Sequence, residues 1–179
     1  GIITPVVCVS SSSLAGIDML LKEISLLVPS SSEVPAVSAG DAEVKCSESD
    51  PLSAFVFKTV ADPFTGRMSY IKVMSGKLTS DSTVVNMTTG ENEKIGKLYF
   101  MKGKQQIEAQ EVTAGDIAAA VKIDALTSDT LCSPERKVQY DKIDFPKPCY
   151  SMAVSAKAQG DESKISAGIQ RLLEEDRTL

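Results

Sequence analysis

The sequence predicts a mainly β fold, in which a small closed barrel or sandwich is flanked on each side by an incomplete domain. Glycine-containing turns recur roughly every 8–12 residues between residues 51 and 135. The segments between these turns are short and rich in β-branched residues, which is typical of an antiparallel all-β unit. Each flank shows one short apolar strand pattern followed by one amphipathic helix pattern.

The middle region divides into six predicted strands. Between residues 67 and 76, Met68, Tyr70 and Met74 alternate with Ser69, Ile71 and Val73, the period of a strand with one buried face. Alanines in "AGDIAAAV" also allow a short helix, but Gly115-Asp116 makes a turn before it and the regular series favours a strand. The predicted strands are 52–61, 67–76, 82–88, 93–101, 105–113 and 116–123. The turns between them are Thr65-Gly66, Ser75-Gly76, Thr89-Gly90, Lys102-Gly103 and Ala114-Gly115.

The two flanks each predict one strand and one helix. Residues 2–9 predict a buried strand and residues 14–28 a helix that ends at Pro29. Residues 148–157 predict a second strand, followed by a helix with Asp161 as N-cap. One strand and one helix cannot bury both of their faces. We therefore expect an excised fragment, with a linker over 32–50 and a connector over 136–147.

Composition excludes several classes of site. The 179 residues contain no histidine, which removes the commonest general base and zinc ligand. The four cysteines are far apart in sequence, so no CxxC metal or redox motif exists, and we expect reduced thiols in a cytoplasmic protein. No apolar run approaches the roughly 20 residues that span a bilayer. "GIITPVVCV" lacks a basic leader and a cleavage site, so a signal peptide is not expected.

Charge is unevenly distributed along the chain. The net charge is −5, which argues against a protein that coats nucleic acid by bulk electrostatics. Residues 51–110, however, carry eight basic and five acidic residues, a net charge of +3. This region contains "DPFTGRMSYIKVMSGKL" at 62–78. Its basic residues predict either a nucleic-acid contact or a solvated face that blunts a sheet edge.

Several strings, in order along the chain, resemble elongation factor G, the ribosomal translocase among the translational GTPases. "PVVCVSSSSLAGIDMLLKEISLLVPS" resembles the end of the family's GTPase domain. "DPLSAFVFKTVADPFTGRMSYIKVMSGKL", "EKIGKLYFMKGK" and "VTAGDIAAAVKI" resemble its second domain, and "DFPKPCYSMAVSAK" with "RLLEEDRTL" the start of its third. Val9-Ser10-Ser11, Val154-Ser155-Ala156-Lys157 and Glu174-Glu175-Asp176-Arg177-Thr178 depart from the family's usual strings, which suggests a divergent paralogue.

The resemblance implies a specific architecture. Residues 1–31 would be the last strand and helix of the GTPase domain, an incomplete α/β piece. Residues 51–135 would be the translation-factor-type Greek-key β-barrel, called domain II. Residues 148–179 would begin domain III, an incomplete ferredoxin-like α+β piece. The missing GTPase and C-terminal domains would be partners within the same protein, and the ribosome its partner outside, with no membrane contact.

The resemblance also implies nucleotide binding by the full-length protein. Backbone N–H groups around Ser10, Ser11 and Ser12 would face guanine, and the cofactors would be GTP and Mg²⁺. This sequence has no GxxxxGK[ST] phosphate loop. We therefore expect this chain alone to be non-catalytic, with no nucleotide or metal bound. The alternative interpretation of Ser10, Ser11 and Ser12 is an ordinary loop between a strand and a helix, with a serine as the helix cap.

Docking to small-subunit ribosomal RNA is the function that the resemblance implies for the barrel. The candidate residues are Arg67, Lys72, Ser75, Gly76 and Lys77. Glycine at the turn would let backbone approach a phosphate closely. Phe64 and Tyr70 suit either base stacking or, more simply, core packing, and Asp62 and Thr65 suit a turn.

Other interpretations stay open on sequence alone. Glu174, Glu175 and Asp176 form an acidic cluster that suits a divalent metal ion, but a solvated helix end or a contact with a missing domain explains them better. The protein could also be a ribosome-protection or release-factor-type GTPase, which shares this barrel. A free-standing, non-enzymatic interaction barrel is the third possibility.

Overall fold

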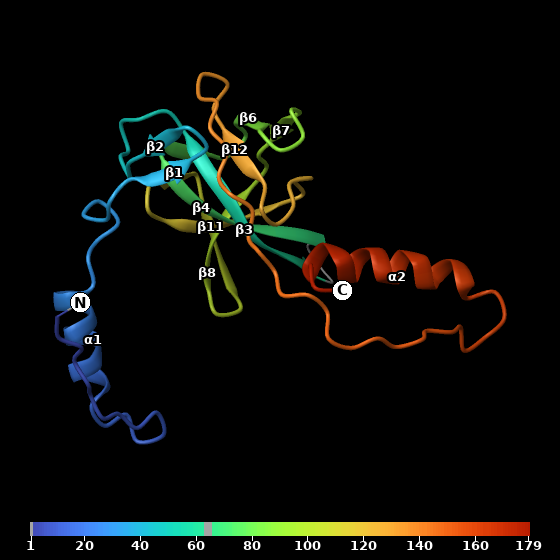
Figure 1. The fold of residues 1–179 in the computed structure, drawn as a ribbon, viewed down its shortest axis with the longest axis horizontal. Helices are drawn as coiled ribbons and strands as arrows, with labels where there is room; N and C mark the ends of the chain where they lie inside the picture. The colour runs from blue at the N-terminus through green and yellow to red at the C-terminus, as the bar shows by residue number, and fades with distance from the viewer. Residues whose placement is uncertain (1, 63–65) are drawn as a thin grey trace. The chain divides into compact units, whose positions relative to one another are not determined.

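The computed structural model describes residues 2–62 and 66–179, which divide into two compact units, 1–34 and 35–179. The predicted roles of Phe64 and Thr65 therefore lie outside the described residues. The first unit contains a single helix, and the second contains twelve strands and a C-terminal helix among the described residues (Figure 1).

The first unit contains helix α1, Ile17–Leu27. The predicted helix is confirmed over these residues. The strand predicted at 2–9 is wrong for this structure, since these residues form neither helix nor strand. A strand needs a neighbour to pair its backbone N–H and C=O groups, and no strand of the described residues pairs with this segment. The apolar stripe of α1 is accordingly exposed at Leu21, Ile24 and Leu27.

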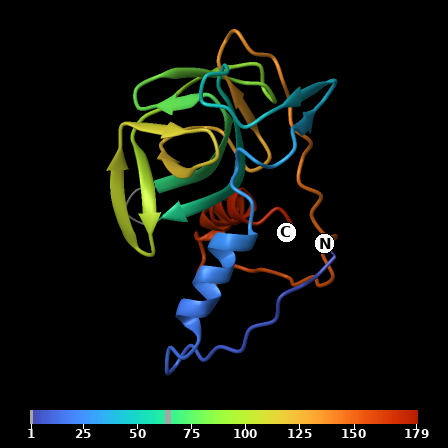
Figure 2. The same cartoon turned by 90° about the vertical axis from the view of Figure 1, so that its left-hand side faces the viewer.

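The second unit is built on an eight-stranded antiparallel sheet in the order β7-β6-β12-β3-β4-β11-β8-β9. Figure 2 shows how these strands curl around a common interior. We call this unit's sheet, together with the β5–β10 pair, the barrel. Its strands are β3 (Ser53–Asp62), β4 (Gly66–Ser75), β5 (Lys77–Thr79), β6 (Thr83–Asn86), β7 (Asn92–Lys94), β8 (Leu98–Lys102), β9 (Gln105–Ala109), β10 (Glu111–Thr113), β11 (Ile117–Val121) and β12 (Thr130–Cys132).

The mainly β prediction is confirmed, and most predicted strands form. The alanine-rich segment is strand β11, as the regular spacing indicated. Predicted strands 93–101 and 105–113 each divide into two, and β5 and β12 were not predicted. Their shortness explains this, because three residues are too few to show an alternating pattern.

One apolar cluster fills the barrel, and β4 shows how the sequence pattern produces it. Ile71 and Val73 are fully buried in this cluster, whereas Lys72 between them is exposed. The alternation predicted that Lys72 lies on the face opposite Ile71 and Val73, and the structure shows that the Ile71–Val73 face is the one turned to this cluster. The cluster comprises Leu52, Ala54, Val56, Ile71, Val73, Leu78, Val84, Ile95, Leu98, Ala109, Val112, Ala118, Ala120, Ile123, Ala125 and Leu131.

The expected linker over 32–50 contains structure and is corrected here. Strands β1 (Val37–Ala39) and β2 (Ala42–Val44) form a hairpin. Ala39 and Val44 are buried in a second apolar cluster, which also contains Val138 and Tyr140 of the expected connector. The serine, proline and acidic residues of this segment are typical of a linker. Ala39 and Val44 nevertheless pack in one cluster with Cys132 of β12, which attaches the hairpin to the barrel.

Polar contacts under the hairpin join distant parts of the chain. The Ser53 hydroxyl lies 2.8 Å from the Tyr140 hydroxyl and 2.7 Å from that of Ser75. Burial raises the pKa of Tyr140, although the hydrogen bond to Ser53 opposes this shift. Burial likewise raises the pKa of the Cys132 thiol, which donates to the Val138 carbonyl. The Tyr140 hydroxyl and the Cys132 thiol therefore stay protonated, and both side chains contribute to the packing of this cluster.

The C-terminal segment forms helix α2, Glu162–Glu175, but not the strand predicted at 148–157. As at the N-terminus, the described residues offer that segment no partner strand. Asp161 occupies the N-cap position, yet its side chain makes no capping hydrogen bond. Its Oδ1 instead accepts from the Lys164 Nζ at 2.6 Å.

Candidate nucleic-acid interface

A β-bulge in β3 shapes the outer face of the barrel. The pairing of β3 with β4 shifts register between Val56 and Lys58, so that Phe57 is the extra residue. Before the bulge Val56 is buried, and after it Thr59 is buried. The bulge thus exchanges the faces of the strand. Simple alternation would put Lys58 on the same face as Val56, whereas the structure exposes it.

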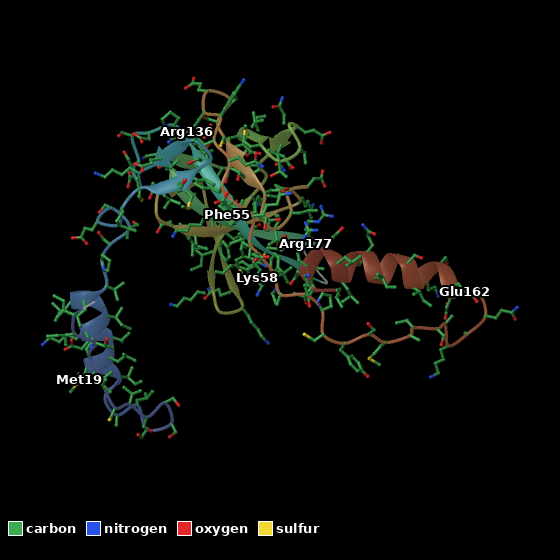
Figure 3. All side chains as sticks on the ribbon, viewed as in Figure 1. Met19, Phe55, Lys58, Arg136, Glu162 and Arg177 are labelled. Carbon is green, nitrogen blue, oxygen red and sulfur yellow. The ribbon has the colours of Figure 1, made fainter. Side chains whose placement is uncertain are left out.

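Basic and aromatic side chains meet on this outer face. Lys58 of β3 lies opposite Tyr70 of β4 in the register of the two strands. Lys72 lies between Phe55 of β3 and the half-exposed Ile117 of β11. Figure 3 labels Phe55 and Lys58 along β3. The rings of Phe57 and Tyr70 are tilted with their centroids 6.2 Å apart. We call Phe57, Lys58, Tyr70 and Lys72 the basic-aromatic face.

The two lysines of this face differ from Arg67, Lys77 and Lys97 of the barrel, which form ion pairs. Both are exposed, and within the described part of the chain neither forms an ion pair. Among the described residues, they share this lack of an ion pair with the exposed residues Lys94, Lys102, Lys104 and Lys122, and differ from these in lying beside aromatic rings. Exposed lysines without acidic partners can accept a phosphate without first breaking an internal contact. Phe57 and Tyr70 are only half-buried, so part of each remains accessible beside the lysines.

Lys77 is a weaker candidate because carboxylates surround it. Its Nζ lies 3.0 Å from Oε1 of Glu111 and 3.7 Å from Oε2 of Glu48. The hydrogen bond and charge of Glu111 raise the pKa of Lys77. A phosphate would have to compete with both acids for this ammonium group.

Ser75 and Gly76 are buried, which contradicts the accessible turn that the sequence suggested. The Ser75 hydroxyl donates to the Pro51 carbonyl at 2.8 Å and contacts Ser53. Gly76 has φ of +71°, and its N–H donates to the Ser47 carbonyl. A Cβ at this position would lie 2.6 Å from the Asp50 carbonyl oxygen. The glycine therefore permits close packing of two protein segments at this point, not the approach of a phosphate.

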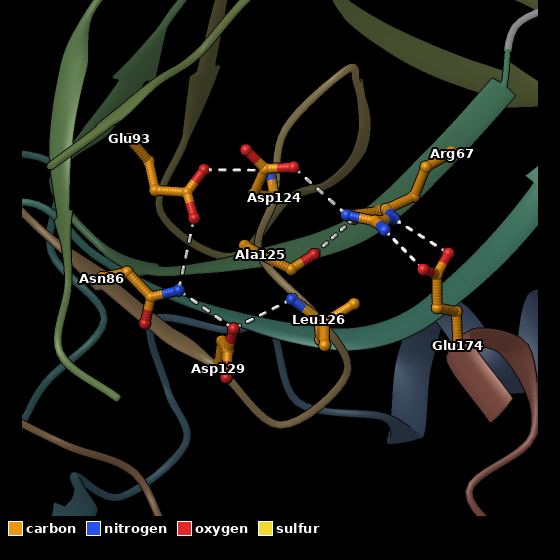
Figure 4. Close-up of polar contacts among 9 residues, drawn as sticks. Arg67, Asn86, Glu93, Asp124, Ala125, Leu126, Asp129 and Glu174 are labelled. Atoms are coloured by element: carbon orange, nitrogen blue, oxygen red, sulfur yellow. Dashed lines mark hydrogen bonds and ion pairs between the residues drawn. The ribbon is translucent and has the colours of Figure 1, made fainter. Parts of the chain in front are cut away.

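Arg67 belongs to a polar network at the end of β4 (Figure 4). Its Nε and Nη2 donate to the two carboxylate oxygens of Glu174 on α2, at 3.2 and 2.6 Å. Nη1 donates to Asp124 at 3.3 Å. Both Arg67 and Glu174 are largely buried, with 27% and 22% of their side chains exposed. The guanidinium is therefore already neutralised by its own chain.

Asp129 anchors the loop that carries Asp124. Its Oδ2 accepts from the Asn86 amide and from the Leu126 N–H, both at 2.9 Å. Glu93 of β7 accepts the backbone N–H of Asp124 at 3.0 Å. These contacts connect the β6–β7 hairpin to the loop beside Arg67 (Figure 4).

The Ser10–Ser12 loop precedes α1 in the other unit. The Ser10 Oγ accepts from the Ser13 N–H at 3.3 Å and contacts the Ser12 hydroxyl, while the Ser10 N–H donates to Ala15 O. The loop is thus a compact serine turn. Within the described residues, no group of three or more Cys, Asp or Glu side chains could hold a metal ion.

Comparison with known proteins identifies the family. Residues 51–134 match elongation factor G domain 2, and residues 145–179 match elongation factor G domain III. The chain belongs to the elongation factor G family. The chain is also similar to a crystal structure of a protein from Thermus thermophilus, with 27% sequence identity and a TM-score of 0.70. That alignment covers 92% of this elongation factor G-like chain and 23% of the Thermus chain.

The family matches agree with the strings that suggested elongation factor G. The barrel and the helix α2 lie in the segments that match domains 2 and III. No helix among the described residues is long and apolar enough to cross a membrane. Lys58 and Phe57 are the functional candidates that sequence reasoning missed, because the bulge that exposes Lys58 has no clear sequence signal.

Proposed function

We propose that this chain is the ribosome-docking and coupling barrel of an elongation factor G-like translational GTPase that acts in ribosomal translocation. The proposal assigns the docking contact to the basic-aromatic face and its ligand to small-subunit ribosomal RNA. The observation that carries it is the pair of exposed lysines without acidic partners, Lys58 and Lys72, beside the rings of Phe57 and Tyr70.

The chemistry of this face suits RNA. Ammonium groups bind phosphates without reading sequence, and aromatic rings can stack on unpaired bases at about 1–3 kcal/mol per base through the part that stays accessible. The net charge of −5 is no obstacle. The charges nearest to a bound phosphate dominate its electrostatic interaction with the protein, since the Debye length is about 8 Å at physiological salt.

For the whole protein we propose GTP and Mg²⁺ as cofactors, in a cytoplasmic setting. Ser10, Ser11 and Ser12 would contribute the guanine contact through backbone N–H groups at their turn. The phosphates and the metal ion would be held by residues beyond this chain, because its sequence contains no phosphate loop. GTP hydrolysis would then supply the directionality of docking and release.

Reversing charge on the basic-aromatic face is expected to weaken ribosome binding. In the double variant Lys58→Glu, Lys72→Glu, two phosphate contacts become repulsions. We expect at least a tenfold lower affinity for small ribosomal subunits at low salt, and a salt slope smaller by about two. The thermal midpoint should change little, because both side chains are exposed. Fluorescence anisotropy of the labelled chain across a salt titration measures both quantities.

The matched control makes the same change of charge elsewhere on the exposed surface of the barrel, at a turn. Lys102 and Lys104 lie at the β8–β9 turn and are both exposed. Lys102→Glu with Lys104→Glu should leave the affinity close to that of the wild type. Equal losses in the two double variants would mean that only total charge matters, and the proposed docking face would be wrong.

A further inference from the structure

We propose that Glu174 and Glu175 form a detachable latch that holds helix α2 on the end of the β3–β4 ribbon. The latch consists of these two side chains with the Arg67 guanidinium and the backbone N–H of Ala61. It would couple the segment that matches domain III to the barrel that matches domain 2. In this arrangement Arg67 recognises a carboxylate of its own chain, not an external phosphate.

The contact between Arg67 and Glu174 is specific. Two N–H groups of one guanidinium donate to the two oxygens of one carboxylate, which fixes the relative orientation of the two groups. By contrast, the Asp124 side chain on the other side of Arg67 is 99% exposed. Solvent screens that second pair, so Glu174 is the principal partner of Arg67.

The second contact covers an open strand edge. Strand β12 pairs with β3 only from Ser53 to Phe55, so the far part of β3 has β4 on one side and no strand on the other within the described residues. The Ala61 N–H lies on this part of β3 and donates to Oε1 of Glu175. An unpaired strand edge invites pairing with other chains. Glu175 therefore satisfies a donor that the barrel itself leaves open.

The acidic residues at the end of α2 are otherwise poorly placed. Carboxylates near a helix C-terminus are disfavoured by the helix dipole, and the last turn of α2 has no basic residue. Each acid nevertheless has its own partner. Asp176 accepts from the hydroxyl and the N–H of Thr178, which lower its pKa. Glu174 and Glu175 both form hydrogen bonds with the barrel, although Glu175 and Asp176 remain exposed.

The latch would be detachable because α2 buries little apolar surface: of its apolar side chains, only Ile165 and Leu173 are even half-buried. No residue of α2 is buried, and Ile169 and Leu172 of its apolar stripe are 43% and 52% exposed. The attachment therefore depends on charge and hydrogen bonds at one end of the helix. Such contacts weaken as salt rises, whereas apolar packing does not. Salt should thus release α2 without unfolding the barrel.

A double-mutant cycle on the complete chain tests the latch. The variants are Arg67→Met, Glu174→Gln and their combination, and the readout is amide exchange at Ala61 and in the last turn of α2, measured by NMR. Each single variant should speed exchange roughly tenfold at these amides. The double variant should match the single variants, because the same contact is lost in all three. Asp124→Asn is the control and should resemble the wild type.

Two outcomes would overturn the latch. One is exchange at wild-type rates in both single variants. The other is a double variant whose effect equals the product of the single effects, since independent sites behave in this way. Glu174 lies outside the barrel core, so Glu174→Gln remains informative even where Arg67→Met lowers barrel stability. The amides of Ile71 and Val73 report that stability in the same spectra.

Discussion

Replacing Gly76 with alanine is expected to destabilise the barrel by about 2–4 kcal/mol, the sum of a backbone cost and an overpacking cost. The residue has φ of +71°, where a side chain costs on the order of 1 kcal/mol. The new Cβ would also lie 2.6 Å from the Asp50 carbonyl oxygen and 2.7 Å from Leu52 Cα. Backbone atoms cannot move aside as a flexible side chain can, so overpacking adds about 1–3 kcal/mol. Urea denaturation followed by circular dichroism measures the loss.

Gly103 provides the matched control for this prediction. Its φ is +60°, but a Cβ there would meet no atom within 4 Å. Gly103→Ala should therefore lower the free energy of unfolding only by the backbone cost of the positive φ, on the order of 1 kcal/mol. If the two variants were equally stable, close packing between Gly76 and the 50–52 segment would not contribute to the fold.

The second large effect is expected from Asp129→Ala, at about 2–3 kcal/mol. The Asp129 residue is 8% exposed, and its Oδ2 accepts from Asn86 and from the Leu126 N–H. Removing the carboxylate leaves these donors without their acceptor, and a buried unsatisfied donor costs about 1–3 kcal/mol. The free energy of unfolding, again from urea denaturation, reports the change.

Asp141 offers a control of the same residue type at an exposed position. Asp141→Ala should change stability by no more than about 0.5 kcal/mol. A similarly small effect of Asp129→Ala would show that water replaces the lost acceptor. The Asn86–Asp129 contact would then not organise the loop that carries Asp124.

The core of the barrel could be predicted from sequence because the alternation of apolar and polar residues is visible within a single strand. Strand β4 shows a period of two, and its Ile71 and Val73 are buried as that period requires. The hairpin β1–β2 shows no such signal, because its burial depends on Val138 and Tyr140, which are distant in sequence. The segments 2–9 and 148–157 have strong strand propensity but find no partner strand among the residues that the structure describes. Propensity cannot form a strand without pairing.

The candidate site was only partly predictable. Lys72 was predicted as a docking candidate on β4 with its exposure left open; the structure exposes it, and its role in docking stays a prediction. Lys58 was missed because a bulge reverses the alternation of β3. Arg67 looked available for phosphate because its partner Glu174 lies 107 residues away. Sequence shows the charge of a residue, but only the fold shows whether that charge is already paired.

Site-specific photocrosslinking to small ribosomal subunits tests the central claim most directly. A photoreactive amino acid is placed at position 72 in one variant and at position 104 in another, both exposed sites on the barrel. Docking through the basic-aromatic face predicts crosslinks to small-subunit ribosomal RNA from position 72, which disappear when Lys58→Glu is added, and none from position 104. Crosslinks from position 104 alone, or from neither position under conditions where the chain binds the subunit, would contradict it.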